Sequence, residues 1–236
     1  MNGVRKSFIP GLLAVLLLAA CQTAPVALVT ATSPPAGPLP QAAPGAVHYR
    51  VDAARSDVRF LVYKAGPLAA VVGYDHVIRA RNFSGEVYLA PDFSASSFSL
   101  TLPVKDFEVD APELRAVEGP DFAQQPSPQA VAGTAEHMLG LEELDADRYP
   151  EVTIQSVKLV GPDWGPDATI RLTLHGTTRD LTVPITVSRE GNDLVATGSF
   201  AILQSEFGIK PHALLGGGLA VEDLVRVRFR LVAGKD

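Results

Sequence analysis

The sequence contains very little cysteine. Cys21 is the only cysteine among 236 residues. A disulfide within the chain is therefore impossible, and neither a CxxC pair nor a Cys/His zinc motif can be built. We predict no metal site and no cofactor from these residue types.

The chain also lacks a basic surface motif and a nucleophile motif. Its formal net charge is -6, only 19% of its residues are charged, and no cluster of Lys and Arg is present. Proteins that bind nucleic acid need such a cluster, so we exclude nucleic acid as a partner. No GxSxG turn follows an apolar run, and no serine lies in a recognisable nucleophile context. We therefore predict that the protein is not an enzyme and has no catalytic residues.

Long hydrophobic runs are missing as well. Arg5 and Lys6 precede an apolar segment at 11–20, which is too short to cross a bilayer of roughly 30 Å as a helix. Leu18-Ala-Ala-Cys21 follows and resembles the lipobox of bacterial lipoprotein signal peptides. We predict a signal peptide over 1–20, with cleavage before Cys21 and acylation of Cys21. The alternative is an ordinary secretory signal that happens to contain a cysteine.

A lipid anchor at Cys21 predicts where the protein resides. Several acyl chains are needed because one chain holds a protein on a membrane only marginally. Gln22 is not the aspartate often linked to inner-membrane retention. The expected location is the bacterial cell envelope, facing the periplasm, with the outer membrane favoured.

The segment after the cysteine is rich in proline and alanine and carries no charge. Residues 22–45 have too few large side chains to form a core, and their prolines interrupt any helix. We predict a tether over 21–46, which holds a globular domain over 47–236 away from the membrane.

Period-two alternation dominates the predicted domain. In 224–231, for example, Val225, Val227 and Phe229 alternate with arginines, which predicts an inner apolar face and a solvated outer face. The connections between the later strands are too short for helical crossovers, so the sheet should be antiparallel. The candidate strands cover 56–64, 77–89, 97–104, 151–160, 168–174, 181–187, 194–203 and 224–231.

Eight antiparallel strands with one apolar face favour a closed barrel, because closure removes the exposed edges. One segment, 110–147, has helical character instead: Ser127-Pro128 is typical of an N-cap followed by proline at the first helical position. We predict that this insertion caps one mouth of the barrel or lies on its side. The segment 214–219, LLGGGL, is either a mouth flap or a plain loop.

Five patches of the sequence resemble the YceI-like lipid- and polyisoprenoid-binding family, and they occur in the family order across 48–232. They are Tyr49-Arg-Val-Asp52 with Ser56-Asp-Val-Arg-Phe60, Phe83-Ser-Gly-Glu-Val87, Asp147-Arg-Tyr-Pro-Glu-Val-Thr-Ile-Gln-Ser156, Leu172-Thr-Leu-His-Gly-Thr-Thr-Arg-Asp-Leu-Thr-Val-Pro184, and Gln204-Ser-Glu-Phe-Gly-Ile209.

The resemblance implies a lipocalin-like barrel whose lumen holds a long-chain isoprenoid or fatty amphiphile. The sequence departs from the family pattern at Gln204, where arginine is usual, and in 73–85, so the entrance and the ligand head group can differ. The implied ligand-binding residues are Phe60, Val62, His76, Phe83, Phe98, Leu100, Leu102, Ile154, Leu172, Phe200, Phe207 and Phe229.

Periodicity alone cannot separate a hollow barrel from one filled by its own side chains. Our first hypothesis is a membrane-anchored carrier of lipid. The second is a packed barrel whose outer face binds a protein partner, and the third is a metal- or haem-binding electron-transfer accessory that uses His76. The partners under consideration are a lipid ligand, the membrane reached through the acyl chains, and a second copy of the chain in a homodimer.

The stretch Gly73-Tyr-Asp-His-Val-Ile78 leaves several interpretations open. Asp75 and His76 point to opposite faces if this stretch is extended, so they can pair directly only in a turn. A catalytic pair, a metal site shared with His212, a polar lip that meets the ligand head group, and a structural turn are the four alternatives. The structural turn is favoured, with the polar lip second.

Overall fold

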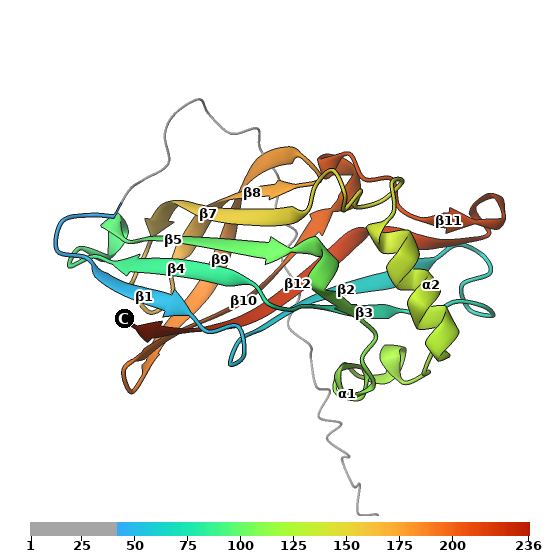
Figure 1. Ribbon diagram of the computed structural model, residues 1–236, viewed down its shortest axis with the longest axis horizontal. Helices are drawn as coiled ribbons and strands as arrows, with labels where there is room; N and C mark the ends of the chain where they lie inside the picture. The colour runs from blue at the N-terminus through green and yellow to red at the C-terminus, as the bar shows by residue number, and fades with distance from the viewer. Residues whose placement is uncertain (1–41) are drawn as a thin grey trace, which may run out of the picture.

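The computed structural model describes residues 42–236, and the predicted signal peptide, Cys21 and most of the predicted tether lie outside this range. Twelve strands form one sheet (Figure 1). Their bounds are β1 Val47–Val51, β2 Asp57–Ala65, β3 His76–Ala80, β4 Ser84–Leu89, β5 Ser97–Pro103, β6 Phe107–Val109, β7 Glu151–Val160, β8 Asp167–Leu174, β9 Thr177–Glu190, β10 Asp193–Leu203, β11 Ala213–Leu214 and β12 Leu219–Lys235.

Eight of these strands form a closed antiparallel ring, which confirms the predicted barrel. The ring runs β1-β4-β5-β7-β8-β9-β10-β12, and the pairing of β1 with β12 closes it. All of its strands, and the hydrophobic core that they enclose, lie within 47–235. No helix within the described part of the chain is long and apolar enough to cross a membrane.

The strands differ in part from the eight candidates, because β1, β6 and β11 were not among them and the candidate at 56–64, β2, lies outside the ring. The predicted strand at 77–89 is two strands, β3 and β4, because Asn82 between them has a φ of 51° in the left-handed region, which an extended strand cannot accommodate. β3 pairs with β2 and β6, whereas β4 pairs with β1 and β5. Sequence alternation continues through the break and therefore hides it.

The strands β2, β3 and β6 lie outside the ring and extend the barrel wall at one end (Figure 1). The long strand β12 makes this possible because it changes partner along its length. It pairs with β2 over 220–230 and with β1 over 233–235.

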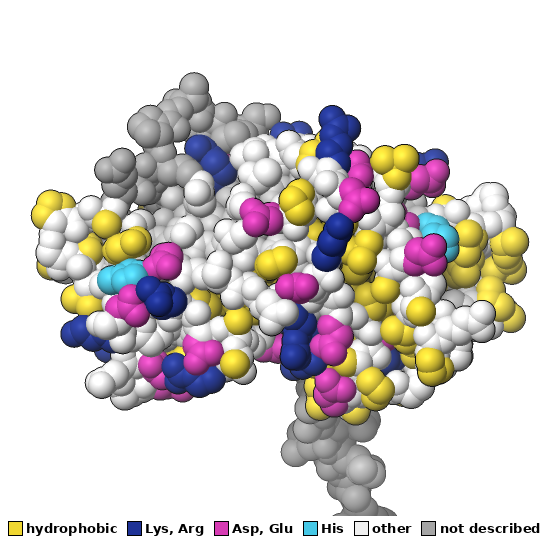
Figure 2. Space-filling model, in the orientation of Figure 1, with side chains coloured by type: hydrophobic (Ala, Val, Ile, Leu, Met, Phe, Trp, Pro, Cys, Tyr) yellow, Lys and Arg dark blue, Asp and Glu magenta, His cyan; other side chains and the backbone are white. Residues whose placement is uncertain are grey.

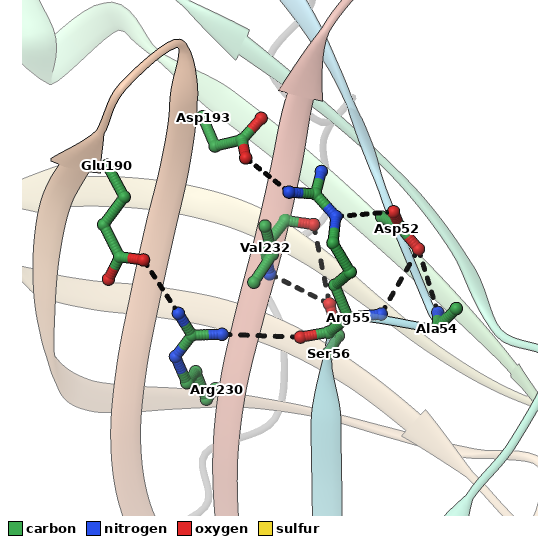
Figure 3. A network of polar contacts seen from close by, with 8 residues as sticks. All are labelled: Asp52, Ala54, Arg55, Ser56, Glu190, Asp193, Arg230 and Val232. Carbon is green, nitrogen blue, oxygen red and sulfur yellow. Dashed lines mark hydrogen bonds and ion pairs between the residues drawn. The ribbon is translucent and has the colours of Figure 1, made fainter.

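The place where β12 changes partner is fastened by polar contacts (Figure 3). The amide of Val232 donates to Ser56 Oγ at 2.9 Å, and Arg55 bridges Asp52 at 2.7 Å and Asp193 at 2.5 Å. Arg230 reaches Glu190 at 3.0 Å. The turn between β1 and β2 is thereby held to β12 and to the β9–β10 hairpin.

The insertion between β6 and β7 covers both faces of the extended wall. The short helix α1, Pro112–Arg115, and the 3-10 turn Pro120–Phe122 pack on the outer face against Leu61 and Val77. The helix α2, Pro128–Leu139, packs on the inner face through Val131, Ala135, Met138 and Leu139.

The start of α2 agrees with the sequence. Ser127 Oγ accepts from the amide of Ala130 at 3.2 Å, which is the predicted N-cap. On β12, Arg226, Arg228 and Arg230 face outward, as the alternation predicts. Arg226 lies over the ring of Tyr63, and Arg228 and Arg230 pair with Glu118 and Glu190.

Candidate functional site

The barrel encloses a cavity of about 620 Å³ that also extends beneath α2. Its wall is mainly aliphatic and aromatic and comes from all strands of the ring and from β2 and β3. The packed-barrel alternative requires a barrel that is filled by its own side chains. The structure does not show such a barrel.

Eleven of the twelve residues predicted to bind the ligand lie in this wall. The predicted residues that line the cavity are Phe60, Val62, His76, Phe83, Phe98, Leu100, Leu102, Ile154, Leu172, Phe200 and Phe229. Phe207 is placed elsewhere: it is fully buried in the barrel core but is not part of the cavity wall. The reason is that β10 ends at Leu203 and the chain then enters a 3-10 turn, Gln204–Phe207, which breaks the alternation.

One face of α2 completes the wall. Ala130, Gly133, Thr134 and His137 line the cavity, and their spacing places them on one side of a helix. No atom lies within 4 Å of the position that a Cβ on Gly133 would take, so this glycine opens directly onto free space. The insertion therefore contributes to the wall of the cavity and does not lie only on the outer surface.

The ionisable residues of the wall gather at one end of the cavity. The strand register brings them together: Lys64 pairs with Val221, the amide of Val221 donates to the carbonyl of His212 at 3.0 Å, and His76 pairs with Val62. This group, which we call the polar end, comprises Lys64, Tyr74, His76, His137, Glu143 and His212.

Within the polar end, Asp75 and His76 do not pair with each other. Asp75 Oδ1 accepts from the backbone amide of Lys64 at 2.9 Å, which ties the start of β3 to the end of β2. His76 Nδ1 instead lies 2.6 Å from Asp110 Oδ2. Asp75 thus has a structural role at the start of β3, although residues 73–75 are irregular and do not form a turn, and His76 is part of the cavity wall.

Asp110 sets the orientation of His76. Its side chain is completely buried, and its Oδ1 accepts from the amide of Val77 at 3.0 Å and from Arg115 at 2.6 Å. A carboxylate accepts hydrogen bonds, so the proton of the imidazole sits on Nδ1. The Nε2 atom has no hydrogen-bond partner among residues 42–236 and is left for a bound molecule.

Opposing influences act on the acidity of Asp110. Burial by itself would raise the pKa of this carboxyl, but the hydrogen bond and positive charge of His76, with the bonds from Val77 and Arg115, outweigh burial and lower the pKa below its ordinary value. Asp110 is held in the left-handed region, with a φ of 53°. Aspartate tolerates this conformation better than most residues do.

Glu143 and two histidines form the other half of the polar end. His212 Nδ1 lies 2.6 Å from Glu143 Oε1, and the rings of His137 and His212 are 4.8 Å apart. Burial raises the pKa of Glu143, although the charges of His212 and His137 act in the opposite direction. These residues connect α2 to the segment before β11.

The chemistry of this end is that of recognition. Among the described residues, no group of three or more His, Cys, Asp and Glu side chains is arranged to hold a metal ion. His76 and His212 both line the cavity, but each is paired with its own carboxylate. The polar end offers hydrogen-bond donors beside a long apolar chamber.

Sequence reasoning missed most of the polar end. Tyr74 belongs to the stretch Gly73–Ile78 that the sequence singled out, whereas Lys64 lies in β2 and meets it only through strand pairing. His137, Glu143 and His212 come from the insertion and from the segment before β11, and no motif links them. Arg115 was not among the predicted site residues, yet it is the buried partner of Asp110.

Comparisons with known proteins agree with this architecture. Residues 49–233 match the model of the YceI-like domain. BcnA of Burkholderia cenocepacia is 23% identical, with a TM-score of 0.57 over 77% of this chain and 98% of that chain. A polyisoprenoid-binding domain from Saccharophagus degradans, described as implicated in plant cell wall breakdown, is 15% identical, with a TM-score of 0.54 over 80% and 99%. A search of curated proteins finds no match.

Proposed function

Because this chain belongs to the YceI-like domain family, we propose that it is a binding protein, without catalytic activity, that holds a long-chain isoprenoid or fatty amphiphile in its barrel. The observation that carries the proposal is the cavity of about 620 Å³, whose size is that of small-molecule sites and whose wall is mainly apolar. Each methylene that leaves water for such a wall contributes about 0.8 kcal/mol.

The wall also gives the ligand a direction. We infer that its polar group lies at the polar end, near Lys64, Tyr74 and His76, and that its tail extends along the barrel. The Nε2 of His76 has no hydrogen-bond partner among residues 42–236 and can bind a polar group, and the Nζ of Lys64 and the hydroxyl of Tyr74 are donors. A head group that carries hydroxyl or carbonyl oxygens suits this set.

Membrane attachment is the second part of the proposal. Acylation at Cys21, after removal of 1–20, would anchor the carrier on the periplasmic side of the cell envelope, with the outer membrane favoured. Replacement of Cys21 by serine should abolish incorporation of labelled palmitate and move the protein out of the washed membrane fraction. Unchanged labelling would refute the anchor without affecting the cavity.

Native mass spectrometry tests the ligand directly. Residues 42–236, secreted into a bacterial periplasm and purified without detergent, should carry an extra mass that organic solvent releases as a long-chain lipid. A bare polypeptide mass, with no uptake of added prenyl or fatty ligands, would contradict the proposal.

A pair of variants on α2 shows whether that lipid occupies the cavity. Gly133→Trp places an indole in the open space and should reduce the loaded fraction at least about fivefold, since occupied volume excludes the tail. Ala132→Trp adds the same group to the exposed side of the same helix and should load normally. Equal loading of the two variants would place the lipid outside the barrel.

A further inference from the structure

Two loops at the polar end expose an unusual amount of apolar surface. They are 66–73, between β2 and β3, and 214–218, from the last residue of β11 to the start of β12. Among the described residues, five of the nine exposed large hydrophobic side chains lie in these two loops; Val71 is 81% exposed and Leu215 is 74% exposed. We call these five residues the rim patch: Leu68, Val71, Val72, Leu214 and Leu215.

The two loops form one continuous surface. The amide of Leu68 donates to the carbonyl of Gly218 at 2.8 Å. A Cβ on Gly66 would lie 2.7 Å from that same carbonyl oxygen, so glycine is what allows the loops to approach so closely. In Figure 2, hydrophobic side chains gather at the end of the molecule where β11 and the loops that follow β2 and β11 lie.

The rim patch adjoins the cavity. Leu214 is 47% exposed and also lines the cavity, so this side chain is part of its edge. Gly73 and Leu219, at the ends of the two loops, line it as well. A molecule that enters or leaves at this end must pass the rim patch.

We propose that the rim patch inserts into the surface of a lipid bilayer, so that a lipid passes between the bilayer and the cavity without crossing water. This proposal rests on the lipid-binding function proposed above. Soluble surfaces rarely keep apolar side chains together without a partner. A bilayer fits because 65–73 and 213–221 contain no charged residue at all, and an uncharged surface can enter the acyl region at little cost.

The charges that border the rim patch indicate which force drives its binding to a bilayer. Lys64 and Asp75 flank the first loop and pair with each other at 3.7 Å, and Lys210 and Glu222 flank the second loop with opposite signs. The positive and negative charges along this border are therefore equal in number, and the border is not basic. Binding should be driven by apolar insertion, and neutral phosphatidylcholine vesicles should suffice, with weak dependence on salt.

The length of the chain before the barrel permits this orientation. The first described residues lie at the end of the barrel opposite the rim patch (Figure 1). From its 17 residues, β12 spans about 55 Å along the barrel. The segment 21–41 can reach at most about 70 Å. A chain anchored at Cys21 can therefore place the rim patch on the same membrane.

Flotation with phosphatidylcholine vesicles tests the proposal on residues 42–236, which hold the whole closed sheet and match in extent the BcnA chain, a separate chain of this fold. The wild type should float with the vesicles in low and high salt. Val71→Asp combined with Leu215→Asp should weaken vesicle binding at least about tenfold, because two charges would have to enter the acyl region.

A matched control places the same charges elsewhere. Val117 and Trp164 are 66% and 68% exposed and lie outside both loops. Val117→Asp combined with Trp164→Asp should float like the wild type. A wild type that does not float, or a rim variant that floats equally well, overturns the proposal. So does a wild-type dimer in sedimentation that the rim variant dissociates, because the patch would then be an interface between copies.

Loading from ethanol-dispersed fluorescent fatty acid separates this proposal from the proposed function. The rim variant should load as the wild type does, since its cavity wall is unchanged. Normal flotation without loading would refute lipid carriage and leave membrane docking in place. Normal loading without flotation would refute docking alone.

Discussion

At the scale of single residues, Arg115 shows how a buried charge can organise a binding site. Its guanidinium is fully buried and donates to Asp110, to the carbonyl of Asp75 and to the carbonyl of Gln124, each at 2.6 Å. Arg115→Leu would leave the carboxylate of Asp110 buried beside His76 without the guanidinium that pairs with it. We expect the free energy of unfolding to fall by about 3–5 kcal/mol.

Chemical denaturation with an exposed ion pair as control measures this loss. Lys105 and Asp147 pair at 2.6 Å on the surface, and Lys105→Gln should change stability by about 0–1 kcal/mol. If Arg115→Leu unfolds at the same denaturant concentration as Lys105→Gln, the buried network does not hold the polar end together.

The lowered pKa of Asp110 predicts a pH dependence whose sign is fixed. A depressed carboxyl pKa means that the unfolded chain binds the proton more readily, so the stabilisation is present above the unfolded value of about 3.9 and is lost as pH falls through the folded value. Asp110→Asn imitates the protonated form. The stability gap between wild type and this variant should be largest near neutral pH and shrink steadily below about pH 4.

Urea denaturation of both proteins at several pH values measures that gap. Other acids with lowered pKa values, such as Asp147, are present in both proteins and cancel in the difference. A gap that stays constant from neutral pH to well below pH 4 would mean that the carboxylate is not stabilised in the folded protein.

At the scale of elements, two of the recognised sequence patches prove to be in contact. Gly176 lies in the β8–β9 turn with a φ of 69°, and a Cβ there would lie 2.4 Å from the ring of Tyr149, which precedes β7. Tyr149 also contacts His175, with ring centroids 4.8 Å apart. The glycine is required for two separate reasons, its backbone conformation and this close contact.

A second glycine allows the cost of the backbone conformation to be measured apart from the cost of the contact with Tyr149. Gly191, in the β9–β10 turn, has a φ of 65°, but no atom lies within 4 Å of its Cβ position. Gly191→Ala should cost about 1 kcal/mol for the left-handed backbone alone. Gly176→Ala should cost at least about 1 kcal/mol more, because Tyr149 must also move. Equal thermal unfolding midpoints for the two variants would show that the ring of Tyr149 moves aside at no cost in stability.

The helices and strands also show which features could be predicted from the sequence and which could not. The strand β5 and the part of β12 at 224–231 were predictable because their apolar side chains face one core and so recur at every second position. The break at Asn82 was not, because it interrupts the backbone without interrupting the alternation. The polar end was mostly hidden, since His137 and Glu143 join it only through tertiary packing, although His76 and His212 had been considered together. Eleven residues of the wall, ten of them apolar or aromatic and the other His76, were named from alternation and the family resemblance.

At the scale of the whole molecule, the integrity of the barrel depends on the place where β12 leaves β2 and joins β1. Ser56 Oγ accepts from the amide of Val232 there, and the valine is buried. Ser56→Ala should lower stability by about 1–3 kcal/mol, because it leaves that amide unpaired. Hydrogen exchange should accelerate at Val232 and along β1.

Hydrogen exchange at a distant strand provides the comparison. The β7–β8 pairing lies on another part of the ring, and its amides should exchange as in the wild type. Acceleration spread evenly over all strands would instead indicate global destabilisation. No acceleration at Val232 would show that another group satisfies its amide.

The pairing of β1 with β12 joins the two extremes of the folded segment, because Tyr49 lies opposite Lys235. A growing chain therefore cannot close its ring until almost all of that segment is available. Until then, the strand edges and the apolar chamber are open to other chains. We expect the emerging protein to depend on chaperones until the ring closes. The same late closure would give a lipid an opportunity to be enclosed as the barrel forms.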